Sequence, residues 1–177
     1  MDSEQTIEVT LTREEIYKAH LLGGKATIEY MARQAKFTNP NPNPEERTWE
    51  RLDADMYGKE GEFAAAKALG RPIKDGFSFD VGDLQIRTVD SPTKRLRIKE
   101  KDILHNVPCV LVCMNRLFNR YILKGWYYPK EIKPEWWMNQ YEAYFVPNEL
   151  LRPMNTLPLD EIDRKKEAYR KNVLDDI

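Results

Sequence analysis

The middle of the chain alternates between hydrophobic and polar residues, and this spacing is typical of β-strands with one buried face. Val107–Met114 is apolar almost throughout, as expected for a strand buried on both faces. The alternation predicts strands at Phe77–Val81, Leu84–Thr88, Leu96–Lys99, Val107–Met114, Tyr121–Trp126 and Ala143–Val146, with a weaker one at Thr6–Leu11. Ser91 and Pro92 mark a turn, so the strands Leu84–Thr88 and Leu96–Lys99 are expected to form a hairpin.

The N-terminal third of the chain is predicted to be helical. Thr12 and Glu15 have the spacing of a capping box, which places a helix over about Arg13–Ala35. The pair Gly23 and Gly24 should strain or break that helix.

A second helix is predicted over about Glu46–Leu69, with Gly70 as its end. Prolines at alternate positions make residues 39–44 a stiff connector between the two helices. Short helical turns are expected near Pro129 and Pro134, and an exposed, charged helix from Asp160 onward. The predicted organisation is an N-terminal helical segment with its connector (1–45), an α/β core (46–153) and a charged tail (154–177).

The composition favours a soluble globular protein without a general affinity for nucleic acids. Hydrophobic residues make up 41% and charged residues 32% of the chain, and the formal net charge is −1. Nucleic-acid binding would therefore need a local basic patch. No stretch is long and apolar enough to span a membrane, and Cys109 and Cys113 are interpreted as buried thiols of a reducing compartment. These features predict a cytoplasmic protein.

The strand phase gathers polar residues on one face. Apolar residues occupy odd positions up to Val81 but even positions from Leu84 onward, so the phase must slip through a bulge or sharp bend near Gly82. The slip places four polar residues on a common face: Asp80, Asp83, Gln85 and Arg87. The predicted hairpin would bring Lys99 opposite Asp83 or Gln85.

Such a face suits metal-dependent hydrolysis of phosphodiesters. Carboxylate and amide oxygens hold hard divalent cations such as Mg²⁺ or Mn²⁺, and Glu62 of the preceding helix adds a further carboxylate. A nearby cation positions the attacking water or offsets transition-state charge. Each acid also has a simpler interpretation, as a polar turn residue or a solvated helix residue.

These residues resemble the motif of the PD-(D/E)xK nucleases, which have the restriction-endonuclease-like fold. Glu62 stands in an alanine-rich helix, Asp80 begins Asp-Val-Gly, and Gln85 begins Gln-Ile-Arg-Thr. The segment Gly58–Gly70 followed by Asp80–Thr88 is similar to small phage-encoded proteins of that type, and the similarity extends over about 57–153. The resemblance implies an α/β fold with a mixed central sheet flanked by helices, and a role in phage DNA metabolism.

The resemblance also implies roles for individual residues. Asp80 would be the motif aspartate and a metal ligand, and Glu62 a further ligand. Gln85 stands where the second acid is usual, and Arg87 where the catalytic lysine is usual. Because an arginine does not act as a base at neutral pH, Lys99 is a candidate for the missing amine, and Asp83 for the missing carboxylate.

A dense run of cations follows the polar face. Lys94, Arg95, Arg97 and Lys101 are candidates for contact with the DNA backbone, although a solvated strand face explains them equally well. Two other functions stay open: a catalytically inactive DNA-binding module of the same fold, and an inhibitor that binds a host protein. A homodimer is also compatible with the sequence, because related nucleases cut two strands by pairing two copies.

Overall fold

The computed structural model of the protein describes residues 6–34, 44–73 and 81–164, and it shows a mixed α/β architecture. Its helices and strands follow in the order β1 (Ile7–Thr10), α1 (Arg13–Gln34), α2 (Pro44–Leu69), β2 (Gln85–Val89), β3 (Leu96–Ile98), α3 (Glu100–His105), β4 (Cys109–Asn115), β5 (Arg120–Tyr127), β6 (Trp137–Met138) and β7 (Ala143–Val146). None of the helices in these ranges is long and apolar enough to cross a membrane.

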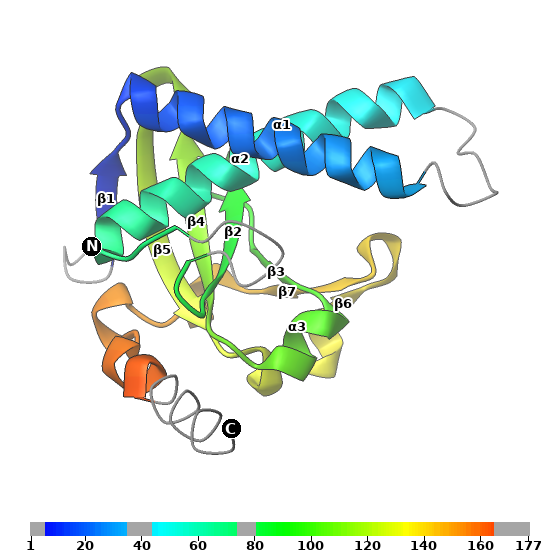
Figure 1. Ribbon diagram of the computed structural model, residues 1–177. Helices are drawn as coiled ribbons and strands as arrows, with labels where there is room; N and C mark the ends of the chain where they lie inside the picture. The colour runs from blue at the N-terminus through cyan, green and yellow to red at the C-terminus, as the bar shows by residue number, and fades with distance from the viewer. Residues whose placement is uncertain (1–5, 35–43, 74–80, 165–177) are drawn as a thin grey trace, which may run out of the picture.

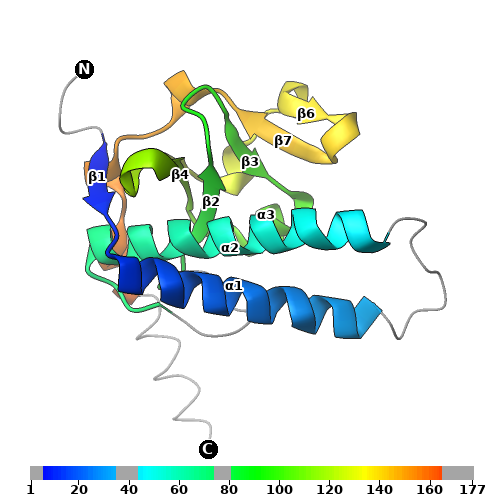
Figure 2. The ribbon, with the colours of Figure 1, turned by 90° about the horizontal axis from the view of Figure 1, so that it is seen from above.

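The described strands form two sheets, and the two long helices cover one of them. The first sheet has the order β1-β5-β4-β2, and the second has the order β3-β7-β6. The helices α1 and α2 lie side by side on one side of the first sheet, and the second sheet lies on the opposite side (Figures 1 and 2). The architecture is therefore layered, with the first sheet in the middle.

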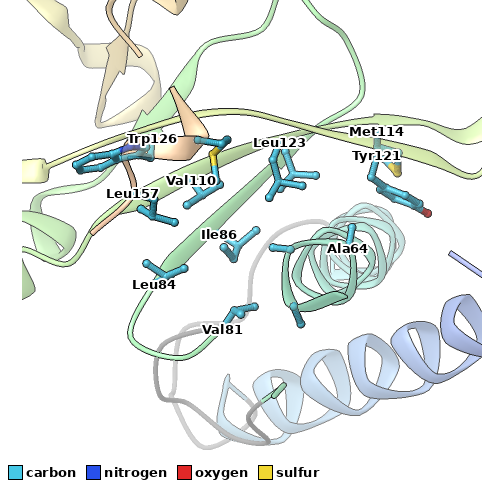
Figure 3. Packing of buried hydrophobic residues seen from close by; sticks show 14 of the residues in the cluster. Ala64, Val81, Leu84, Ile86, Val110, Met114, Tyr121, Leu123, Trp126 and Leu157 are labelled. Carbon is cyan, nitrogen blue, oxygen red and sulfur yellow. The ribbon is translucent and has the colours of Figure 1, made fainter. Parts of the chain in front are cut away.

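Strand β4 divides its side chains between two hydrophobic cores. Val110 and Val112 face α2, where Ala64 and its neighbours allow close packing (Figure 3). Cys109 and Leu111 point the other way and pack with residues of the second sheet. This arrangement explains why the segment is apolar on both faces, as the sequence predicted.

The predicted hairpin between the second and third strands is wrong. Strand β2 pairs in parallel with β4, and β3 pairs antiparallel with β7 in the other sheet. The chain from β2 to β4 therefore crosses over through β3 and α3, as a parallel pair requires. The alternation correctly predicted which residues of each strand are buried, but it carries no information about the partner strand.

The predicted phase slip takes the form of a tight turn. Val81 and Leu84 bond to each other through both backbone groups, and both side chains are fully buried. Gly82 and Asp83, between them, both have positive φ angles, of 53° and 116°. The rest of the predicted strand Phe77–Val81, including Asp80, lies outside the described residues.

The capping box at Thr12 and Glu15 is present, with both reciprocal bonds formed.

The expected break at Gly23 and Gly24 is wrong, because α1 runs without interruption. Gly23 instead lets the two helices approach closely: an added Cβ would lie 2.6 Å from the Cα of Met56. At Gly24 an added Cβ would meet the Leu52 side chain at an ordinary 3.9 Å.

Several further predictions agree with the described residues, whereas residues 39–43 of the predicted connector lie outside them. Gly70 ends α2 with a φ of 62°, and short 3₁₀ turns start at Pro129 and Pro134. Residues 159–164 are helical, which is the described part of the predicted tail helix. The first strand, β1, pairs with β5 and completes the first sheet on that side.

The two adjacent glycines of α1 give a matched pair of substitutions. We expect Gly23→Ala to lower the free energy of unfolding by about 1–3 kcal/mol, because the methyl group collides with the backbone of α2. Gly24→Ala should raise it, by up to about 1 kcal/mol, because alanine favours the helix and finds space. Urea denaturation of both variants measures the difference. Equal effects would contradict the close approach at Gly23.

Candidate functional site

Two candidate residues project from the same face of β2. Ile86 packs against α2, and Thr88 lies against Gly61 of that helix. Gln85 and Arg87 alternate with them, and their partners in β4 are Cys109 and Leu111, which belong to the second core. Both side chains therefore start on the side of the second sheet.

Arg87 is held by a buried carboxylate that the sequence analysis missed. Its Nη2 donates to Asp102 Oδ2 at 2.6 Å, and its Nε donates to the backbone oxygen of Arg97 at 3.2 Å. Asp102 is 3% exposed and belongs to α3, which follows β3 in the connection from β2 to β4. Together these two hydrogen bonds join β2, the end strand of the first described sheet, to β3 and to α3.

The same carboxylate fixes Lys99. The backbone N–H of Lys99 donates to Asp102 Oδ2 at 2.8 Å, which caps the start of α3. An acid three residues after the cap position is a known helix-start signal, but the lysine at the cap position hides it here, because serine, threonine, aspartate and asparagine are usual there. Lys99 therefore reaches the neighbourhood of Arg87 from the second sheet, and not across a hairpin.

The surroundings of Lys99 favour its neutral form. Burial lowers the pKa of the amine below its ordinary value of 10.5, and the charges of Arg97, Arg87 and Lys101 lower it further. Asp102 acts in the opposite direction but does not outweigh them. A half-buried lysine among cations therefore loses its proton at a lower pH than an exposed lysine does.

The candidate metal ligands are less closely gathered. Glu62 is 8% exposed, and Lys59 Nζ donates to its Oε2 at 2.5 Å. Glu62 lies on α2, in the helix layer, whereas the Gln85 side chain starts on the opposite side of β2. To reach Gln85, the Glu62 carboxylate would have to pass around β2. Asp83 lies in the turn before β2, and Asp80 lies outside the described residues. Within the described ranges, no group of three or more Asp, Glu, His or Cys residues is arranged to hold a metal ion.

The candidate DNA-binding residues occupy different settings. Lys94 pairs with Asp90 at 2.6 Å on the surface, and Arg95 is exposed. Arg97 is partly buried, and its Nη2 donates to the backbone oxygen of Tyr141 at 2.8 Å. Lys101 is exposed on α3, next to Asp102. The predicted alternation is confirmed, since Leu96 and Ile98 are fully buried between these cations.

A second buried polar cluster joins the helices to the first sheet. Glu60 is 5% exposed; it accepts a hydrogen bond from the hydroxyl of Tyr121 and bonds the imidazole of His20. Burial, followed by the hydrogen bond and charge of Glu60, raises the pKa of Tyr121. Glu60 is 40 positions from His20 and 61 positions from Tyr121 in the sequence, so no local motif predicts the cluster. The cluster connects α1, α2 and β5, and we assign it to the fold.

The pair of Arg87 and Asp102 has a testable energetic consequence. Arg87→Met removes the partner of a buried carboxylate, so we expect unfolding free energy to fall by about 3–5 kcal/mol. Lys94→Met breaks an ion pair whose side chains are both 58% exposed, and it should cost about 1 kcal/mol or less. Urea denaturation measures both variants. A small effect of Arg87→Met would show that the buried pair does not hold the two sheets together.

The lowered pKa of Lys99 predicts how it titrates. In ¹³C NMR of the reductively methylated protein, the Lys99 signal should titrate below pH 10.5, with Lys99→Arg giving the assignment. Arg97→Gln should raise the Lys99 pKa, because it removes the charge that lowers it most. Arg95→Gln, a change of an exposed arginine in the same run, serves as the control. An unchanged titration in Arg97→Gln would contradict the electrostatic origin of the shift.

Comparisons with protein-family models, with curated proteins and with solved structures found no match for this chain.

Proposed function

We propose that the protein is a metal-dependent DNA endonuclease with a restriction-endonuclease-like core, in which Lys99 replaces the usual motif lysine. The observation that carries the proposal is the position of Lys99: its backbone N–H and the Arg87 side chain donate to the same oxygen of Asp102, and its half-buried amine lies near enough to Arg87 for that charge to lower its pKa. Arg87 occupies the motif position but is committed to Asp102. The amine is therefore the better candidate for proton transfer.

The proposed metal site uses oxygen ligands. Glu62 and Asp80 supply carboxylates, Gln85 supplies an amide oxygen, and Asp83 is a further carboxylate near the start of β2. These are the donor atoms that Mg²⁺ and Mn²⁺ prefer. The bound cation would supply Lewis-acid polarisation of the scissile phosphate.

Lys99 acts on the attacking water in the proposed reaction. Its neutral amine takes a proton from the water as the water oxygen bonds to phosphorus and the P–O bond to the leaving strand breaks. Arg97 and Lys101, which flank Lys99 in sequence, stabilise the negative charge of the phosphodiester and its transition state. Because the reactive form is the neutral amine, cleavage should increase with pH and level off below pH 10.5.

Cleavage of supercoiled plasmid and of labelled single strands, with Mg²⁺ or Mn²⁺, tests the proposal. We expect Lys99→Met to slow cleavage by about 100-fold or more and to abolish the rise with pH. Asp80→Asn and Glu62→Gln should abolish cleavage, whereas Lys25→Met, at an exposed position on α1, should retain it. Circular dichroism of each variant checks that the fold is intact. Wild-type cleavage by Lys99→Met would refute the assigned role.

A second function is favoured by a specific observation. The guanidinium of Arg87 is occupied by Asp102 and the Arg97 backbone, which suits a structural role at a site that has lost its chemistry. The protein would then be a catalytically inactive module that binds DNA or a host protein. Absence of metal-dependent cleavage in the folded wild type, with retained DNA binding, would favour the DNA-binding module. Absence of both would favour a protein partner.

A further inference from the structure

The outer face of the second sheet combines cations with aromatic rings. In β3, Leu96 and Ile98 point into the second core, so Arg97 points to the opposite face. Arg95, just before the strand, is exposed, and Lys99 directly follows the strand and is partly exposed. The residue of β7 directly opposite Arg97 is Phe145. The strand order places β3 beside β7, and Figure 2 shows both on the side of the molecule away from α1.

The rings on this face are held in place by specific contacts. Arg97 donates to the backbone oxygen of Tyr141 at 2.8 Å. The ring centroids of Tyr141 and Phe145 lie 5.4 Å apart, with an angle of 62° between the ring planes. Tyr141 is 49% exposed. Phe145 is partly exposed and belongs to neither hydrophobic core of the described residues. These rings are therefore available on the surface without serving the core.

We propose that this face, formed by Arg95, Arg97, Lys99, Phe145 and Tyr141, binds single-stranded DNA. The cations Arg95 and Arg97 would follow the phosphates, while unpaired bases stack on Tyr141 and Phe145. A duplex does not fit this combination, because its bases are already stacked and paired and present no faces to the rings. The inference rests on the proposed function and names its substrate class.

The position of the face relative to the candidate site supports the assignment. Lys99 is the last residue of the cationic run on this face, and it is also the candidate base. A DNA strand lying along β3, with bases over Phe145 and Tyr141, would bring a phosphate toward Lys99, which follows β3. Charge complementarity along the run thus leads directly to the residue expected to act.

Binding measured without metal separates this inference from the nuclease activity. Fluorescence anisotropy in EDTA uses a labelled oligothymidylate of about 20 nucleotides, a duplex of equal length and an oligouridylate. We expect the oligothymidylate to bind more tightly than the duplex, with affinity falling as salt increases. Equal or tighter binding of the duplex would overturn the inference, and tighter binding of the oligouridylate would overturn the assignment to DNA.

The rings are tested by substitutions that retain hydrophobicity. The double variant Tyr141→Leu with Phe145→Leu should bind oligothymidylate about tenfold or more weakly, because leucine offers no face for stacking. Phe118→Leu, at a 64% exposed ring on the loop between β4 and β5, should bind like the wild type. Arg95→Gln should flatten the salt dependence by one phosphate contact. Wild-type affinity of the double variant would overturn the inference, whether or not the protein cleaves DNA.

Discussion

The arrangement of the candidate site depends on one buried carboxylate. Asp102 Oδ2 accepts hydrogen bonds from the Arg87 side chain and from the Lys99 backbone, which come from different sheets. Leaving this buried carboxylate without a partner would cost several kcal/mol of folding free energy. The hydrogen bonds from Arg87 and from the start of α3 avoid that cost, and they keep both groups beside Asp102. These bonds place the Arg87 side chain and the Lys99 backbone beside the same oxygen. The proposed chemistry uses the amine because the guanidinium already has this structural task.

Local patterns in the sequence predicted local structure well. The capping box at Thr12, the burial of Leu96 and Ile98 and the doubly buried β4 all follow from interactions within a few residues. The pairing of strands did not follow from them. Alternation determines which face of a strand is buried. The pairing of β2 with β4, and not with β3, depends instead on how all the elements pack together in the completed fold. The pair Gly23 and Gly24 likewise shows only that side chains are absent there. It does not show that α2 packs into the space at Gly23.

The candidate site was predictable in its residue types and not in its connections. Gln85, Arg87 and Lys99 were recognisable as polar residues of suitable chemistry, yet Asp102 was not: its partner Arg87 lies 15 residues away, and the lysine at the cap position hides the local one. The cluster of His20, Glu60 and Tyr121 illustrates the same point in the helix layer. Each of these acids is buried because groups remote in sequence neutralise or bond it, and a burial of this kind depends on the completed fold.

The pairing of β1 with β5 has a consequence for the solubility of the protein. Ile7 pairs with Leu123, and Glu8 forms an ion pair with Arg120, so a short N-terminal segment covers the outer side of β5. Without that segment, β5 would present a row of backbone groups seeking partners, and a second molecule could supply them. The first strand thus protects the sheet against intermolecular β-pairing. Shortened forms of the chain that begin beyond Thr10 would be prone to aggregate, although the candidate site itself is complete in them.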